Sequence, residues 1–292
     1  MATAAQWIAA SRPRTLPAAV APVAVGTACA HVAGGVALGP ALAALGGALA
    51  IQIGANFAND AFDGERGVDG PGRLGPTRAV GAGLVTAAAM KRAMIAAFAV
   101  AMGFGIYLVA VVGWPVVAIG LASIAAAIAY TGGPWPLGYH GLGDVFVIVF
   151  FGGVAVCGTT YVQIGTVPCV AWLAAVPVGA LATAILVVNN LRDRAGDARA
   201  GKRTLVVRFG RRAAIAEYAA LHAVADLAAI AIAIHVRSPW PLLPLATLPL
   251  AARRTAAVAR TDGAALNPLL GATAQLLLLH SAALTAGIAL AR

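Results

Sequence analysis

The chain has 292 residues, of which 61% are hydrophobic and 10% are charged, whereas a soluble domain usually has about 25% charged residues. Apolar runs of ~20 residues, long enough to span a bilayer, recur along almost the whole sequence. A soluble protein of this size could not bury so many of them. The formal net charge is +10, but the basic residues lie in short segments between apolar runs. This placement excludes a nucleic-acid-binding protein and indicates an integral membrane protein in contact with the lipid bilayer.

The expected fold is a single all-α domain over residues 1–292, built from nine membrane-spanning helices. In chain order the predicted spans lie near 15–36, 39–58, 92–112, 114–131, 143–163, 168–189, 213–235, 239–252 and 267–290. The eighth span is short and rich in proline. Residues 1–11 lack a charged start, an apolar core and a cleavage site, so no cleaved signal peptide is expected.

The distribution of basic residues tests this arrangement. With a cytoplasmic N-terminus, the inner segments are 1–14, 59–91, 132–142, 190–212 and 253–266. Together with Arg92 at the inner end of the third span, they hold 18 of the 20 Lys and Arg residues. This asymmetry follows the positive-inside rule, so we expect a multi-pass protein of the cell membrane. The inner loops 59–91 and 190–212 are much longer than the others and are the expected site of function.

Amide and acidic side chains gather where the first long loop leaves its helix. Asn59, Asp60 and Asp63 lie there, and Asn56 precedes them by one turn. Asp60 and Asp63 are three residues apart, so on a continuing helix they share one face. Carboxylate and amide oxygens suit Mg²⁺, which binds a few carboxylates together with substrate phosphates.

The second long loop begins with the same kind of cluster. Asp193 and Asp197 are four residues apart, and Asn189 precedes Asp193 by one turn. One such cluster alone could be a group of solvated loop charges, but two, each followed by cations, favour a binding site. Mg²⁺ would bridge the carboxylates to a diphosphate, and the cations would neutralise its remaining charge. Neither cluster contains His or Cys, so zinc is not expected.

The first cluster resembles an aspartate-rich motif of the UbiA superfamily of intramembrane aromatic prenyltransferases. The family motif Asn-Asp-x-x-Asp-x-x-x-Asp is matched by Asn59, Asp60 and Asp63. The chain departs from the motif at its last position, where Gly67 stands, and Asp69 follows two residues later. Whether Asp69 replaces the missing carboxylate is open at this point.

The second cluster matches the family's other motif, Asp-x-x-x-Asp, at Asp193 and Asp197. The chain is most similar to the branch that prenylates 1,4-dihydroxy-2-naphthoate in menaquinone biosynthesis. The segments that carry this similarity are 12–17, 59–69, 74–78, 130–133, 138–144, 150–152, 189–193 and 201–205. A Tyr-x-x-x-Lys motif common in the superfamily is broken, because Pro134 stands four residues after Tyr130. A lysine contact to the diphosphate would then come from Lys202.

The resemblance implies a helical bundle around a central cavity open to lipid, with two long cytoplasmic motif loops. It also implies a Mg²⁺-dependent reaction between polyprenyl diphosphate and 1,4-dihydroxy-2-naphthoate. The prenyl chain would join the ring, CO₂ and diphosphate would leave, and demethylmenaquinone would form. The alternatives are transfer to another aromatic acceptor, such as 4-hydroxybenzoate or homogentisate, transfer of a polyprenyl phosphate to a sugar, or a membrane transporter. A transporter would place its charges at the bilayer midplane, whereas most acidic residues here lie at the inner edge.

The resemblance assigns a role to each candidate residue. The expected magnesium ligands are Asn59, Asp60, Asp63, Asp193 and Asp197, with Asn56 and Asn189 close by. The expected diphosphate contacts are Arg66, Arg78, Lys202 and Arg203. Arg14 would hold the carboxylate of the acceptor, Tyr130 and Tyr139 would line the acceptor site, and Asp144 would deprotonate the ring hydroxyl.

Overall fold

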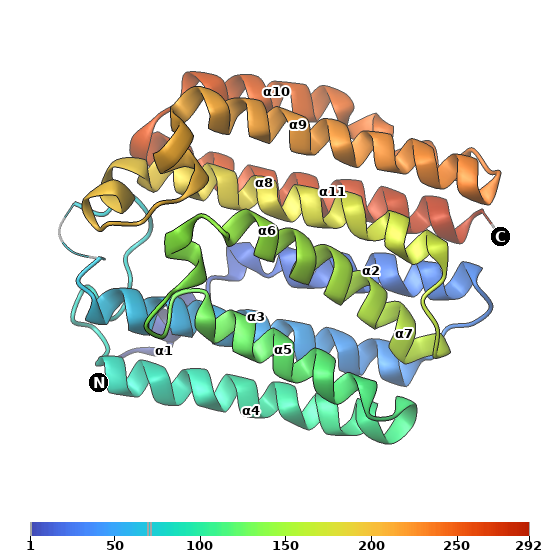
Figure 1. Cartoon of the computed structure of the whole chain (residues 1–292), viewed down its shortest axis with the longest axis horizontal. Helices are drawn as coiled ribbons and strands as arrows, with labels where there is room; N and C mark the ends of the chain where they lie inside the picture. Colours follow the sequence, from blue (N-terminus) through green and yellow to red (C-terminus); the bar gives the residue numbers. More distant parts are fainter. Residues whose placement is uncertain (1, 69, 71, 292) are drawn as a thin grey trace.

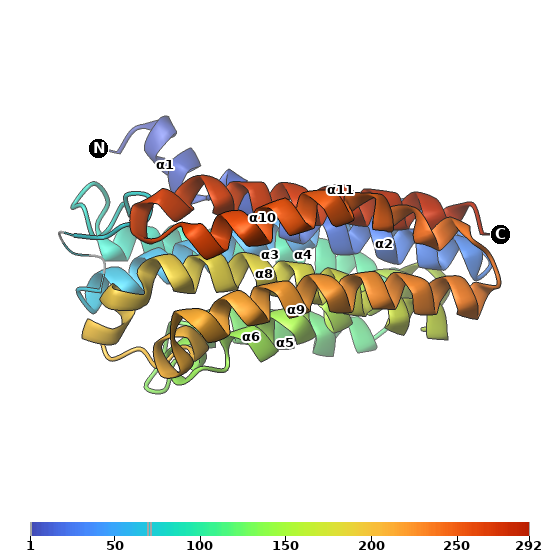
Figure 2. The same ribbon diagram turned by 90° about the horizontal axis from the view of Figure 1, so that it is seen from above.

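Backbone hydrogen bonding dictates the secondary structure of this chain, because only helices and closed barrels satisfy their own polar groups in lipid. A computed structural model describes residues 2–68, 70 and 72–291, and this part of the chain contains helices and no strand. The helices lie side by side along the long axis of the molecule (Figures 1 and 2). They are α1 (Ala4–Ala10), η1 (Pro13–Thr15), α2 (Pro17–Val32), α3 (Leu38–Glu65), α4 (Ala87–Val112), α5 (Pro115–Ala129), η2 (Leu137–His140), α6 (Gly143–Val147), η3 (Ile148–Cys157), α7 (Gly158–Ile164), α8 (Cys169–Arg199), α9 (Leu205–Val236), η4 (Trp240–Thr247), α10 (Leu248–Arg260), η5 (Gly263–Leu266) and α11 (Asn267–Ala289).

The number of membrane spans follows from helix length and hydropathy. Within the described residues, six helical segments are long and apolar enough to cross a membrane: α3, α4, the continuous run α6–η3–α7, α8, α9 and the run η5–α11. A seventh is obtained if the segments Ala4–Thr15 and Pro17–Val32, bent by 48°, form one span. The chain is therefore a multi-pass, all-helical membrane protein. Each of the nine predicted spans overlaps a helical segment, but within the described residues only six or seven segments meet this criterion, and α5, with 15 residues, is too short for it.

The predicted eighth span, 239–252, is not one α-helix. Its first part is the 3₁₀-helix η4, and α10 then continues well beyond residue 252 to Arg260. Pro241 and Pro244 lie within η4, where each removes a backbone donor that a regular α-helix would use. The prolines noted in the sequence therefore account for this break.

Both motifs lie on helices, so the prediction that they belong to long loops is wrong. Helix α3 continues to Glu65 and α8 to Arg199, which moves the loop starts from residues 59 and 190 to residues 66 and 200. The last helical turns persist because their polar side chains find partners within the protein, as described below. Asp69, the candidate replacement for the missing motif carboxylate, lies outside the described residues.

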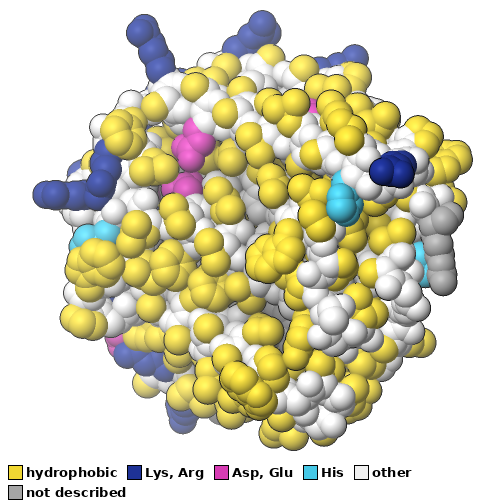
Figure 3. All heavy atoms as spheres, turned by 45° about the vertical axis from the view of Figure 1, so that its right-hand side comes forward, with side chains coloured by type: hydrophobic (Ala, Val, Ile, Leu, Met, Phe, Trp, Pro, Cys, Tyr) yellow, Lys and Arg dark blue, Asp and Glu magenta, His cyan; other side chains and the backbone are white. Residues whose placement is uncertain are grey.

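Helix α8 is the central element of the bundle. In its most apolar window 78% of the residues are buried, against 17% for α4. The outer surface is correspondingly apolar, and Ile95 and Ile106 on α4 are 61% and 70% exposed. Hydrophobic side chains cover most of the face shown in Figure 3. A surface of this kind suits contact with lipid chains.

Close backbone contact fixes η3 against α8. A Cβ atom added at Gly152 would lie 2.5 Å from the carbonyl oxygen of Ala175, and one added at Gly179 would lie 2.9 Å from the carbonyl oxygen of Ile148. Small residues permit this approach, as is common between membrane helices.

We expect Gly152→Val to destabilise the bundle, because its side chain must push η3 away from α8. Overpacking of this kind costs roughly 1–3 kcal/mol or more. Gly153→Val is the matched control, since a Cβ at Gly153 meets nothing within 4 Å in the described structure. Thermal unfolding in detergent should show a lower midpoint for Gly152→Val only; equal midpoints would refute the packing argument.

Candidate active site

Asp63 is the centre of a charged cluster at one end of the bundle, where α3 and α8 end (left in Figure 1). Its carboxylate is buried, with 2% of the residue exposed. The Tyr139 hydroxyl donates to Oδ1 at 2.7 Å. Arg78 Nη1 and Lys202 Nζ each donate to Oδ2 at 3.3 Å. Four of the residues predicted from the sequence, Asp63 included, thus meet in one place.

Lys202 joins the two aspartate motifs. Its ammonium lies 3.3 Å from Asp63 Oδ2 on α3 and 3.7 Å from Asp197 Oδ1 on α8, and it also lies 4.6 Å from the centre of the Tyr139 ring. Its backbone N–H donates to the Asp197 carbonyl at 2.8 Å, which holds it at the end of α8. Carboxylates from both motifs therefore converge on one cationic position.

Tyr139 acts as a neutral hydrogen-bond donor in this cluster. Burial, then the negative charge of Asp63 and the hydrogen bond to it, raise the pKa of Tyr139 above its usual range, so it stays protonated at neutral pH. Arg203, predicted to contact diphosphate, has an exposed side chain, and its backbone N–H donates to the Tyr139 carbonyl at 2.8 Å. In the structure Arg203 therefore contacts the cluster through its backbone.

Asp60 is bonded differently from Asp63, although both lie on α3. Asp60 is 1% exposed, and its two oxygens accept from the backbone N–H groups of Ala79 and Val80, each at 3.0 Å. These bonds fix the loop after α3 next to Arg78, whose Nη1 donates to the Asn59 carbonyl at 2.7 Å. The carboxylate of Asp60 thus anchors the segment that brings Arg78 to Asp63.

Asp193 belongs to a second buried network. Arg192, 3% exposed, donates to both Asp193 oxygens at 2.9 and 2.5 Å, to Asn189 Oδ1 at 2.7 Å and to Asn267 Oδ1 at 3.0 Å. Asn267 in turn donates to the Leu74 carbonyl at 2.8 Å. This network ties α8 to the start of α11 and to the first long loop. The importance of Arg192 was not evident from the sequence, where it was one of many loop cations.

Asn59 and Arg66 hold the turn that follows α5. The Thr131 hydroxyl donates to Asn59 Oδ1 at 2.9 Å. Arg66 donates through Nη1 to the Thr131 carbonyl and through Nη2 to the Gly133 carbonyl, the latter at 2.6 Å. Arg66 is thus bonded to this turn, and its guanidinium lies 5.2 Å from the Tyr139 ring centre.

Asn56 connects α3 to the N-terminal segment. Its amide donates to the Ser11 carbonyl at 2.9 Å and to the Thr15 hydroxyl at 3.1 Å. Arg14, in the same segment, is exposed and lines a cavity of about 510 Å³ between the starts of α2 and α11. The other residues around this cavity are Pro17, Asn267, Pro268, Gly271, Ala272, Ala274 and Gln275.

Tyr130 and Asp144 lie on another side of the cluster. A Cβ added at Gly143 would be 2.8 Å from the Tyr130 hydroxyl, so that hydroxyl packs beside the start of α6, where Asp144 is 6% exposed. Tyr130 therefore borders the same part of the site as Asp144.

The donor set fits Mg²⁺ better than a softer metal. Among the described residues, no three His, Cys, Asp or Glu side chains converge as a ready-made metal site. Mg²⁺ does not need one, because it commonly takes one or two carboxylates and completes its shell with water and substrate phosphates. Asp63 and Asp197 supply hard oxygens, and Lys202 between them shows that positive charge is stabilised at that position.

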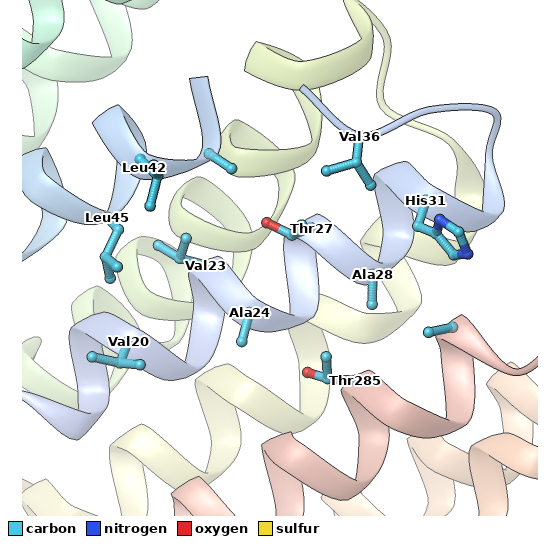
Figure 4. Close-up of a pocket in the computed structure, with 12 residues that line it drawn as sticks. Val20, Val23, Ala24, Thr27, Ala28, His31, Val36, Leu42, Leu45 and Thr285 are labelled. Carbon is cyan, nitrogen blue, oxygen red and sulfur yellow. The ribbon is translucent and has the colours of Figure 1, made fainter. Parts of the chain in front are cut away.

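An apolar groove of about 510 Å³ lies on a different part of the bundle (Figure 4). Val20, Val23 and Thr27 of α2 face Leu42 and Leu45 of α3 across it. Thr285 and Ala289 of α11 complete its lining. The groove presents mostly hydrocarbon and offers few polar groups to a ligand.

Comparison with known proteins identifies the family. Residues 19–289 match the model of the UbiA prenyltransferase family. The chain belongs to this family. Its relatives include proteins named 1,4-dihydroxy-2-naphthoate octaprenyltransferase from Mycobacterium tuberculosis and Escherichia coli. The first is 40% identical over 99% of this chain and 98% of its own length. The second is 40% identical over 98% of this chain and 96% of its own length.

Solved structures agree with the UbiA fold. A UbiA homolog from Archaeoglobus fulgidus, bound to DMAPP and Mg²⁺, superposes with a TM-score of 0.66 at 15% identity, over 96% of this chain and 99% of that one. The apo structure of a UbiA homolog from Aeropyrum pernix K1 gives 0.68 at 16% identity, over 92% and 96% of the two chains. At these identities the similarity establishes the fold alone.

The bonding of Asp60 predicts a local effect of its substitution. In Asp60→Asn one oxygen acceptor is lost, so the amides of Ala79 and Val80 should exchange with solvent faster by roughly tenfold, given ~1.5–3 kcal/mol for a hydrogen bond to a charged group. Asp63→Asn is the matched control and should leave both amides protected. Hydrogen-exchange mass spectrometry on the peptide that contains Ala79 and Val80 measures this effect. Unchanged exchange in Asp60→Asn would show that Asp60 does not anchor the loop.

Proposed function

We propose that this UbiA-family protein transfers a polyprenyl chain from polyprenyl diphosphate to 1,4-dihydroxy-2-naphthoate, with loss of diphosphate and CO₂. The observation that carries the proposal is that Asp63 and Asp197, one from each motif, converge on the ammonium group of Lys202, while Arg78 also pairs with Asp63. The acceptor assignment is supported by the names of the two relatives with 40% identity.

Mg²⁺ is proposed to bind between the two motifs. Asp63 and Asp197 are its principal ligands in this proposal; Asn59, Asp60 and Asp193 complete the candidate set, though Asp60 and Asp193 already have protein partners. When bound, Mg²⁺ neutralises the diphosphate as a leaving group. Arg78 and Lys202 lie where they can donate to diphosphate oxygens, and their charge opposes reassociation of the diphosphate with the allylic carbon.

The acceptor is proposed to enter through the cavity lined by Arg14, which would hold its carboxylate. Tyr130 and Tyr139 would border the ring, and Asp144 would accept the proton of a ring hydroxyl. The allylic C–O bond breaks and its electron pair leaves with diphosphate. The ring carbon then bonds to the allylic carbon and loses its carboxylate as CO₂, which restores aromaticity. The ring oxygen then takes back a proton from Asp144, and the product is the quinol form of demethylmenaquinone.

The arrangement in the membrane follows from the same proposal. All nine predicted spans would cross the bilayer, with the N-terminus and the charged end of the bundle in the cytoplasm, as the basic residues indicate. The diphosphate would then bind at the water-facing end, while the prenyl chain lies among apolar helices in a cavity open to lipid. The groove of Figure 4 is one apolar surface available to such a chain.

A product assay tests the function. Purified protein in lipid, with Mg²⁺ and a polyprenyl diphosphate, should convert 1,4-dihydroxy-2-naphthoate into a prenylated product that has lost CO₂, as read by mass. 4-Hydroxybenzoate and homogentisate, offered separately, should give no product. Product from another acceptor alone would retain prenyl transfer and overturn the assigned acceptor. No product from any acceptor would refute the proposed function.

Asp63 and Asp197 should control the requirement for Mg²⁺. We expect Asp63→Asn and Asp197→Asn each to raise the Mg²⁺ concentration at half-maximal rate, by roughly 10–100-fold, because loss of a direct ligand weakens the site at least as much as loss of a supporting residue. Glu65→Gln is the matched control: Glu65 ends the same helix as Asp63 but is exposed and paired with Lys91 at 2.7 Å. An unchanged Mg²⁺ requirement in both Asp variants would exclude a metal between the motifs.

A further inference from the structure

Arg12 is a half-buried cation to which the sequence pattern assigns no role, whereas it assigns one to Arg14. Its backbone is left-handed, with φ 51° and ψ 67°, a conformation that non-glycine residues adopt rarely and at an energetic cost. The segment is held in place by hydrogen bonds. The Thr15 hydroxyl donates to the Arg12 carbonyl at 3.0 Å, and Asn56 of α3 donates to the Ser11 carbonyl at 2.9 Å.

This backbone places Arg12 at the Asp63 cluster. Asn56, which holds the segment, lies on α3 one turn before Asp60. The charges that act on the Arg12 guanidinium are those of Arg78, Arg73, Asp60 and Asp63. Arg12 is therefore next to the first aspartate motif, whereas Arg14 is exposed and lines the neighbouring cavity.

The guanidinium of Arg12 has an unused donor. Its Nη2 is buried and has no hydrogen-bond partner among the described residues. The carboxylates nearby are already engaged: Asp60 by the backbone of the following loop, and Asp63 by Tyr139, Arg78 and Lys202.

Arg192 provides the comparison within the same protein. Arg192 is more enclosed than Arg12, with 3% of the residue exposed, and its guanidinium donates to four acceptor atoms of Asp193, Asn189 and Asn267. A buried donor without an acceptor is costly, and here a strained backbone is retained at the same residue. Both features are explained if the acceptor is an oxyanion of the substrate.

We propose that Arg12 donates to the diphosphate of the prenyl donor, alongside Arg78. The diphosphate is favoured over the acceptor carboxylate because Arg12 shares the environment of Asp63 and Arg78, where the proposed metal-diphosphate site lies. The proposal rests on the proposed function for the nature of the substrate. It adds a donor-binding residue from the N-terminal segment, which lies outside both aspartate motifs.

The test measures diphosphate binding without catalysis. Full-length protein in lipid nanodiscs is titrated with inorganic diphosphate at a fixed Mg²⁺ concentration, by calorimetry. Arg12→Gln should weaken binding by roughly tenfold to a hundredfold, as expected for loss of a charge-assisted hydrogen bond. Arg12→Lys should fall between Arg12→Gln and the wild type, because lysine keeps the charge and loses the planar fork.

Arg237→Gln is the matched control. Arg237 is also a left-handed arginine, with φ 53° and ψ 42°, but it is exposed at the C-terminal end of α9. The Arg237→Gln variant should bind diphosphate like the wild type. This control shows whether replacing a left-handed arginine weakens binding by itself, without the loss of a donor at the site. Thermal unfolding checks that each variant folds, and Arg12→Lys decides the question if Arg12→Gln does not fold.

Three results would overturn the inference, and each leads to a different conclusion about Arg12 and the proposed function. Wild-type affinity in Arg12→Gln and Arg12→Lys would remove Arg12 from the diphosphate site and leave the proposed function intact. Unchanged diphosphate binding with a raised KM for the aromatic acceptor would assign Arg12 to the acceptor carboxylate instead. No binding of diphosphate by the wild type would reject the inference together with the proposed function.

Discussion

The cation bridge between α3 and α8 is the interaction on which the functional end of the bundle depends. Asp63 and Asp197 lie in the last turns of their helices, where the negative end of each helix dipole disfavours a carboxylate. Burial adds a desolvation cost. Lys202 between the two carboxylates offsets both effects, with Arg78 also bonded to Asp63. Two helix ends that each carry an acid create a position of strongly negative potential, which is the environment that a divalent cation requires.

The rest of this end serves to hold that position. Asp60 fixes the loop that carries Arg78, Arg192 ties α8 to α11 and to the same loop, and Asn59 holds the turn before Tyr139. Each contact joins segments far apart in the sequence. The site is therefore built on the ends of rigid helices. Its geometry is maintained mainly by buried hydrogen bonds to charged groups, which are costly to leave unmade.

The sequence predicted the fold class and the central residues because both depend on local patterns. Apolar runs of membrane length identified the helices, and the spacing of Asp60 with Asp63 and of Asp193 with Asp197 identified the motifs. It could not separate Asp60 from Asp63, because their different bonding depends on a loop some 20 residues away. It placed the helix ends too early, since polar residues normally mark the membrane edge, and tertiary partners here extend both helices.

Arg12 and Arg14 also show what the sequence could not predict, although they are only two positions apart. Both are arginines in the segment Arg12-Pro13-Arg14, and position in the sequence gives no reason to prefer either. The left-handed backbone at Arg12 turns one side chain toward the charged cluster and leaves the other exposed. A reaction between a prenyl diphosphate and an aromatic carboxylic acid needs one cation for the diphosphate and another, at a separate place, for the carboxylate. The two arginines lie in different environments on either side of Pro13, and Asn56 on the motif helix holds this segment beside the site through its hydrogen bonds to Ser11 and Thr15.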